Sequence, residues 1–230
     1  MDPTTADVAP PPVPRTQRSA ARIAVFGATG ATGRELVRTA LERGHVVVAA
    51  ARDPARLVVR DDRLEVRRAD VLDPGSLAAV VDGADAVVSA LGSGAGRVPT
   101  EVYSAGVAHV LDAMRAAGVR RFVGISAAPL ASAADATRLE HAVLFPLLHR
   151  FFGGAYEDMR RMEALLAASD LDWTVLRPPR LTDKPTTGRY RTAPGHLRGG
   201  RRITRGDLAA AMLDTLDDRA ARCAVLGVAT

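Results

Sequence analysis

Short apolar runs alternate with longer amphipathic segments along most of the chain. The run at Val46–Ala51 is continuously apolar, which is typical of a parallel strand that is covered on both faces. The apolar runs predict strands at Arg22–Phe26, Val46–Ala51, Leu64–Ala69, Ala84–Leu91, Arg121–Ser126, Trp173–Leu176 and Ala224–Val228. Helical patterns lie at Thr32–Arg43, Thr100–Ala117, Tyr156–Ser169 and from Thr204 to Leu216. The alternation predicts an α/β fold, a doubly wound parallel sheet with helices on both faces.

Two stretches depart from this pattern. Residues 1–20 carry five prolines among small polar residues and no apolar period, so we expect a disordered leader or a tag remnant there. The remaining residues, 21–230, are of the size of one domain. Between Ala127 and Gly154 the pattern is irregular, and the apolar part is interrupted by Pro146. This part could be a substrate wall or a subunit contact, but we expect ordinary core, because apolar residues most often lie there.

A glycine-rich turn joins the first predicted strand to the first predicted helix. The stretch reads RIAVFGATGATGREL, with Gly27, Gly30 and Gly33 three residues apart. Glycines allow the sharp turn, the close approach of a pyrophosphate to the backbone and the close packing of the helix on the strand. Phosphates at such a turn would meet the N–H groups of the helix N-terminus. The candidate cofactor-binding residues here are Gly27, Thr29, Gly30, Ala31, Thr32, Gly33 and Arg34.

Several further segments accompany this turn. They are Ala69-Asp70-Val71, Ser89-Ala90-Leu91-Gly92, Val119–Val123 and Leu171–Pro178. Together with the G-x-x-G-x-x-G spacing, the set resembles the atypical short-chain dehydrogenase/reductases, and in particular their NAD(P)H-binding, NmrA-like branch. The resemblance implies a Rossmann fold that binds NAD(P)H.

The residue after the second strand bears on the choice of cofactor. An acid at this place would bind the ribose 2′-hydroxyl of NAD, whereas an arginine can bind the 2′-phosphate of NADP in a bidentate manner. Arg52 therefore favours NADP(H), and Arg34 could assist it. Asp53 leaves the alternative open, since its carboxylate could serve the ribose.

By the same resemblance, Asp70 and Val71 would flank the adenine. The alternative for Asp70 is that it caps a turn before Pro74. The backbone at Ala90, Leu91 and Gly92 would approach the cofactor, and residues 92–96 read as a flexible loop. Pro178 and Arg180 would lie beside the nicotinamide.

Ser126 is the first candidate catalytic residue and also a candidate cofactor-binding residue, because the resemblance places an active-site hydroxyl at this strand end. Ligands of open α/β sheets bind at the carboxyl ends of the strands. An equally weighted alternative is a hydroxyl that satisfies a nearby backbone group.

Tyr156 is the second candidate, and the lysine count argues against it. Lys184 is the only lysine among the 31 basic residues, so a Tyr-x-x-x-Lys acid pair would need tyrosine at the position of Arg180. Tyr156 and Arg160 form a Y-x-x-x-R variant, but a planar guanidinium is a poor replacement for a compact ammonium. We expect Tyr156 not to be the proton donor.

Composition adds few further constraints on the function. Seven basic residues and no acid lie between Lys184 and Arg205, which predicts a solvated loop, with an anionic substrate as the sharper alternative. Nucleic acid is not expected, because aromatic residues barely interleave with these charges. The five histidines show no metal-ligand spacing. The single cysteine, Cys223, is expected to be buried, and no apolar run predicts a membrane span, so we expect a cytoplasmic protein.

These features predict an NADPH-dependent reductase that acts on a small substrate. The resemblance suggests flat, electron-poor molecules such as quinones, flavins, tetrapyrroles or polyketide-like ketones. The competing class is a non-catalytic NADP(H) sensor of NmrA type, which the missing acid pair favours. The arginine-rich composition suggests a bacterial source, and we expect a monomer or a homodimer.

Overall fold

The computed structural model describes residues 20–92, 100–131, 137 and 139–230. Nearly all of the proline-rich leader and most of the glycine-containing loop at 92–96 therefore lie outside the described residues.

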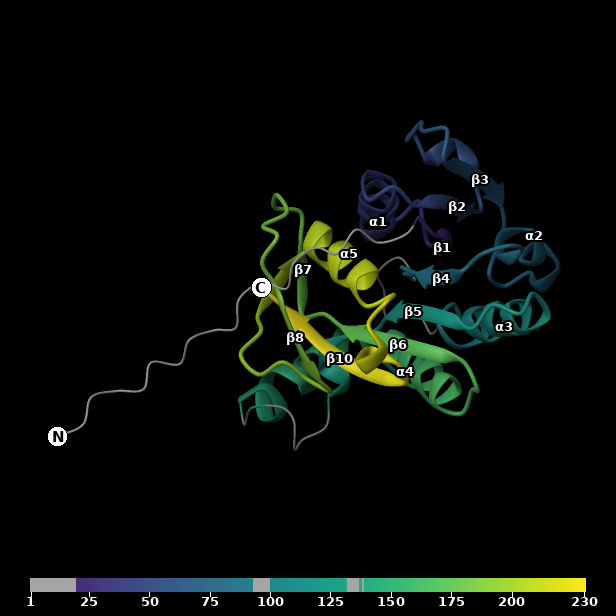
Figure 1. Ribbon diagram of the computed structural model, residues 1–230. Helices are drawn as coiled ribbons and strands as arrows, with labels where there is room; N and C mark the ends of the chain where they lie inside the picture. Colours follow the sequence, from purple (N-terminus) through teal and green to yellow (C-terminus); the bar gives the residue numbers. More distant parts are fainter. Residues whose placement is uncertain (1–19, 93–99, 132–136, 138) are drawn as a thin grey trace.

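An eight-stranded sheet forms the centre of the molecule. Its strand order is β3-β2-β1-β4-β5-β6-β10-β8, running from one end of the sheet to the other in Figure 1. The first seven of these strands pair in parallel, and β8 pairs with β10 in antiparallel. The strands are β1 (Arg22–Phe26), β2 (Val46–Ala51), β3 (Leu64–Arg68), β4 (Ala86–Ser89), β5 (Arg121–Ile125), β6 (Asp172–Arg177), β8 (Arg191–Pro194) and β10 (Ala224–Ala229). The predicted doubly wound sheet is confirmed, and it is a Rossmann fold.

Helices cover both faces of the sheet. They bury the apolar side chains that the central strands present on each face. Along β1, Ile23 and Val25 pack into one apolar cluster, and Ala24 and Phe26 pack into the other. The first cluster is covered by α1 (Ala31–Glu42) and α5 (Arg205–Asp214), and the second by α2 (Ala78–Val81), α3 (Ser104–Ala116) and α4 (Phe145–Ala167). Short 3₁₀ turns lie at η1 (Pro54–Arg56), η2 (Pro74–Ser76), η3 (Ala128–Leu130) and η5 (Arg219–Ala221).

The basic segment after β6 is more structured than its charge suggested. Between Lys184 and Arg205 lie β8 and β9 (Arg202–Thr204), and β9 pairs in parallel with β7 (Arg180–Thr182), which precedes them. The expectation of a loop was therefore wrong, whereas six of the seven basic residues are exposed to solvent as expected. Thr204 caps α5, since its Oγ1 accepts from the Asp207 backbone N–H at 3.0 Å. Asp207 is fully buried and accepts from the N–H groups of Thr187 and Gly188, which fixes the loop between β7 and β8 on the start of α5.

Helix α4 starts earlier than the periodicity indicated. A π-helical turn, η4 (Glu140–Leu144), leads directly into it, and Pro146 occupies the first turn, where proline needs no intrahelical partner. Several large apolar side chains of this region are exposed, namely Leu139, Val143, Leu144, Leu147, Phe151 and Phe152. The expectation of ordinary core was therefore wrong for most of this stretch, although Phe145 is buried.

Buried charged groups tie the elements together. Asp158 of α4 is fully buried and accepts from the N–H groups of Tyr103 and Ser104, so it caps the start of α3. Arg121 lies at the amino end of β5 and donates to the carbonyls of Leu216 and Asp172. Burial lowers the pKa of Arg121 to about 10. Cys223 is exposed and has a φ of 51°, so its predicted burial was wrong.

Candidate functional site

The strand order reverses between β1 and β4, and this reversal defines the candidate site. In open α/β sheets ligands bind outside the carboxyl ends of the strands at such a point. Most residues predicted for the site follow the carboxyl ends of the parallel strands. They are Gly27 after β1, Arg52 after β2, Asp70 after β3, Ala90 after β4, Ser126 after β5 and Pro178 after β6.

Two of the three glycines in the turn after β1 are required by the fold itself. Gly27 has a φ of 75°, and a Cβ there would lie 2.4 Å from the carbonyl oxygen of Ala90. A Cβ on Gly33 would lie 2.0 Å from the carbonyl oxygen of Gly27. Gly30 differs, because it has an ordinary φ of −71° and its Cβ would meet only the Gly27 carbonyl, at 3.3 Å. Steric contacts within the protein therefore require glycine at position 30 much less than at positions 27 and 33.

The start of α1 suits an anion. Gly30 is its N-cap and provides no side-chain cap, and its first turn contains no acidic residue. Ala31 and Arg34 are exposed there, while Thr32 is buried below them. Arg34 donates to the Thr29 carbonyl at 2.6 Å. The free N–H groups and the helix dipole fit a pyrophosphate, and the small residues leave room for it.

At the ends of β5 and β6 three side chains form one network. Ser126 is 5% exposed, and its Oγ donates to Oε1 of Glu163 at 2.6 Å. Arg177 binds the same carboxylate in a bidentate manner, with Nε 3.0 Å from Oε1 and Nη2 2.6 Å from Oε2. The Ser126 hydroxyl thus serves a side chain from α4 rather than a local backbone group.

Tyr156 lies on the same helix face as Glu163, seven residues or about 10 Å further toward the N-terminus of α4. Its ring contacts those of His149 and Phe152, with centroids 5.0 and 6.0 Å away. Burial raises the pKa of Tyr156, and the nearby phenol of Tyr103 raises it further. Arg160 is engaged with Glu157 at 3.6 Å. The surroundings of Tyr156 therefore favour the neutral phenol over the tyrosinate.

Residues 27–219 match a protein-family model whose description is NAD(P)H-binding. The chain belongs to this NAD(P)H-binding family. An uncharacterized chloroplastic protein of Arabidopsis thaliana is 35% identical over 175 residues, which are 73% of this chain and 61% of that protein. YwnB of Bacillus subtilis is 28% identical over 203 residues, 85% of this chain and 92% of YwnB. A 3-diazoavenalumate denitrifying reductase from a Streptomyces species is 34% identical over 169 residues, 68% of this chain and 55% of that protein.

Solved structures agree with the fold. A protein of Burkholderia pseudomallei, described as exported, is 29% identical with a TM-score of 0.76, and the match covers 91% of this chain and all of that one. A short-chain dehydrogenase/reductase of Veillonella parvula, solved in complex with NADP, has a TM-score of 0.77 at 21% identity, over 91% of this chain and 94% of that one. Within the described residues no helix is long and apolar enough to cross a membrane.

The residues predicted for the adenosine side of the NAD(P)H site lie at the ends of β2 and β3. Arg52 is exposed, and Asp53 is used as a cap, since its Oδ1 accepts from the Ala55 N–H of η1 at 3.2 Å. Asp70 forms the turn that the alternative interpretation proposed, with Oδ1 accepting from the Leu72 N–H at 3.1 Å. Val71 is buried. A turn and an adenine contact are compatible, because this hydrogen bond uses only one carboxylate oxygen of Asp70.

The remaining candidates are those predicted for the nicotinamide side. Ala90 is buried and Leu91 is partly buried, whereas Gly92 is exposed at the end of the described segment. Pro178 is buried, and its carbonyl accepts from the N–H of Ala128, two residues after Ser126, at 3.0 Å. Arg180, the first residue of β7, is exposed.

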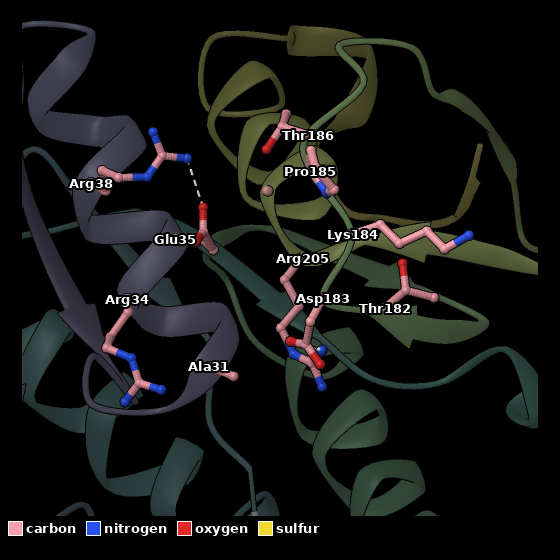
Figure 2. Close-up of a pocket in the computed structure, with 11 residues that line it drawn as sticks. Ala31, Arg34, Glu35, Arg38, Thr182, Asp183, Lys184, Pro185, Thr186 and Arg205 are labelled. Carbon is pink, nitrogen blue, oxygen red and sulfur yellow. Dashed lines mark hydrogen bonds and ion pairs between the residues drawn. The ribbon is translucent and has the colours of Figure 1, made fainter.

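A cleft of about 500 Å³ runs between α1 and the segment from Thr182 to Thr186. Figure 2 shows Glu35 and Arg38 on the α1 side and Asp183 with Arg205 opposite them. The cations do not converge on one point, because Arg34 and Lys184 point away from each other. Arg38 is bound to Glu35 and Arg205 to Asp183, both at 2.6 Å. The cleft adjoins the start of α1 but does not include Ser126 or Arg52.

Sequence reasoning missed Glu163 and Arg177. Arg177 stands at the end of an apolar strand and Glu163 lies seven residues after Tyr156, but neither spacing carries a signal by itself. The described residues contain no group of three or more potential metal ligands.

Proposed function

We propose that the chain is an NADPH-dependent reductase of the atypical short-chain type. The observation that carries this proposal is the turn after β1. Gly30 has an ordinary φ and far looser surroundings than Gly27 and Gly33, and it opens an uncapped helix at the reversal of strand order. A binding site for a pyrophosphate explains both features.

NADPH is preferred over NADH in this proposal. Arg52 is exposed at the end of β2, and Asp53 already caps η1. An arginine in this place supports binding of a 2′-phosphate through charge-assisted hydrogen bonds. Arg34 lies at the start of α1 and adds a second positive charge to the same edge.

The protein residues hold and orient the cofactor in this proposal. NADPH supplies a hydride when bound. The start of α1 binds its phosphates, and the ends of β4, β5 and β6 support its nicotinamide half. The hydroxyl hydrogen of Ser126 is already engaged in a hydrogen bond to Glu163, and burial raises the pKa of Tyr156, so a water molecule is the proposed proton source.

Flat, electron-poor acceptors are the proposed substrates, because their reduced forms take up a proton without a dedicated acid. Quinones and flavins belong to this class, as do tetrapyrroles and polyketide-like ketones. The Streptomyces relative named as a reductase supports the reaction type.

A non-catalytic NADP(H) sensor is the second candidate. It is favoured by the same two observations that remove an acid from the site, the hydrogen bond from Ser126 to Glu163 and the raised pKa of Tyr156. A sensor needs only the cofactor site and a surface that changes when the site is filled.

Steady-state oxidation of NADPH, followed at its absorbance band with a panel of quinones and flavins, tests the proposal. Saturable turnover with at least one acceptor is expected. Tight NADPH binding in calorimetry without turnover across the panel would favour the sensor. Absence of NADPH binding would reject both.

A further inference from the structure

Glu163 links two residues that belong to different strand ends. It accepts the hydroxyl of Ser126 at 2.6 Å and the guanidinium of Arg177 at 3.0 and 2.6 Å. The side chains of Arg177 and Glu163 are only 13% and 12% exposed. A charged pair so far removed from water holds its partners in one arrangement, because breaking it leaves a buried charge uncompensated.

This arrangement decides which hydrogen-bonding groups remain for a ligand. A serine hydroxyl has one hydrogen and two acceptor lone pairs, and here the hydrogen is given to Glu163. Ser126 therefore presents lone pairs only. Arg177 uses Nε and Nη2 for Glu163, and within the described residues its Nη1 has no hydrogen bond. The pair offers one acceptor and one donor.

The position and the small exposed area narrow the choice of ligand group. Ser126 and Arg177 lie at the carboxyl ends of adjacent strands, on the edge that carries the turn after β1. Ser126 is 5% exposed, so it can meet one small group rather than an open substrate surface. A primary carboxamide carries an NH₂ donor and a carbonyl acceptor side by side, which complements this pair.

We propose that Ser126 and Arg177 bind the carboxamide of the nicotinamide ring, with Glu163 as the positioning residue. Ser126 accepts from the NH₂ group and Arg177 donates to the carbonyl. This inference rests on the proposed function, because it requires that the site bind NADP(H). It also replaces the expectation of a catalytic role for Ser126, since polarising a substrate carbonyl would need the hydrogen that is given to Glu163.

The test compares NADP⁺ with its 3-acetylpyridine analogue, in which a methyl group replaces the NH₂ of the carboxamide. Calorimetry gives the dissociation constants of both dinucleotides with the full chain. The wild type should bind NADP⁺ about five- to tenfold more tightly, the usual scale for one hydrogen bond. Phosphate and adenine contacts are common to the two compounds, so they cancel in this ratio.

Three variants test whether the ratio of the two dissociation constants depends on Ser126, Glu163 and Arg177. Ser126→Ala should weaken NADP⁺ binding and leave the analogue unchanged, which brings the ratio to within about twofold. Ser126→Thr keeps the hydroxyl and should keep the ratio. Replacing both Glu163 and Arg177 by leucine frees the Ser126 hydroxyl to turn, so it should lower the ratio below about threefold. Circular dichroism establishes whether each variant is folded. If the double variant does not fold, the comparison of Ser126→Ala with Ser126→Thr still tests the assignment.

Equal binding of the two dinucleotides to the wild type would overturn this inference and leave the proposed function intact. A ratio that survives in Ser126→Ala would overturn it as well. If neither dinucleotide binds, both the inference and the proposed function fail. A ratio that is lost in Ser126→Ala and kept in Ser126→Thr supports the assignment.

Discussion

The two halves of the candidate site are built in different ways. The turn after β1 offers backbone groups, and all of its parts lie within eight residues, Gly27 to Arg34. The ends of β5 and β6 offer side chains, and Ser126 is joined there to a residue 37 positions away in the sequence. A site made of local backbone is specified by glycine spacing, whereas a site made of distant side chains depends on how helix α4 packs on the sheet.

The largest expected effect concerns the side-chain half. Glu163→Leu should lower the free energy of unfolding by about 3–5 kcal/mol, because the guanidinium of Arg177 is left buried without its partner. The double variant with Arg177→Leu should recover most of that loss, since an apolar pair has no charge to compensate. Urea denaturation measures both. If the single and double variants were equally unstable, packing rather than charge would hold this half together.

The next effect concerns the backbone half. Gly30→Val should weaken NADPH binding at least a hundredfold, roughly 2.7 kcal/mol or more, while the melting temperature changes little. The reason is that a Cβ at this position meets only the Gly27 carbonyl, at 3.3 Å, and otherwise faces the space for the phosphates.

Gly33→Ala is the matched control for that change. Its Cβ would lie 2.0 Å from the Gly27 carbonyl oxygen, so this variant should lose stability as well as binding, by about 1–3 kcal/mol. Calorimetry and thermal denaturation separate the two cases. Equal losses of stability would mean that Gly30 also serves the fold.

A smaller effect is expected at the end of β2. Arg52→Ala should weaken NADPH binding ten- to hundredfold, about 1.5–3 kcal/mol, and change NADH binding little. Titration of both cofactors against wild type and variant measures the selectivity. The same loss for both cofactors would show that Arg52 does not bind the 2′-phosphate.

Much of the fold could be predicted, because strands buried on both faces appear as apolar runs and glycine turns are local. The strands β7, β8 and β9 could not, since they are short, lie at edges and carry arginines such as Arg191 and Arg202. The early start of α4 was obscured by Pro146, which marks a first helical turn as well as it marks a break.

The site residues also differ in whether a local sequence pattern predicts them. Gly27, Gly30 and Gly33 could be found because their spacing is itself the signal, and the structure gives two of them a steric reason. Ser126 was found only as a position at a strand end, and its partner Glu163 was missed. A carboxylate on a helix has no sequence mark that tells whether it faces water or a serine across the sheet edge.

The smallest expected effect concerns Tyr156, which lies near the side-chain half without a hydrogen bond to it among the described residues. Tyr156→Phe should lower kcat less than tenfold, well below the loss of about 10²-fold or more that removal of a positioned general acid can cause. Burial raises the pKa of Tyr156 above its ordinary value of 10.0, and a phenol whose folded pKa is raised stabilises the fold below pH 10. That contribution is lost as the pH rises through the folded pKa, so the wild type should lose more stability than Tyr156→Phe above pH 10. Turnover with the best acceptor and denaturation between pH 8 and about pH 11 measure the two effects. A hundredfold fall in kcat with unchanged stability at high pH would instead place the phenol at the reacting atoms and extend the side-chain half from Glu163 along α4 to Tyr156.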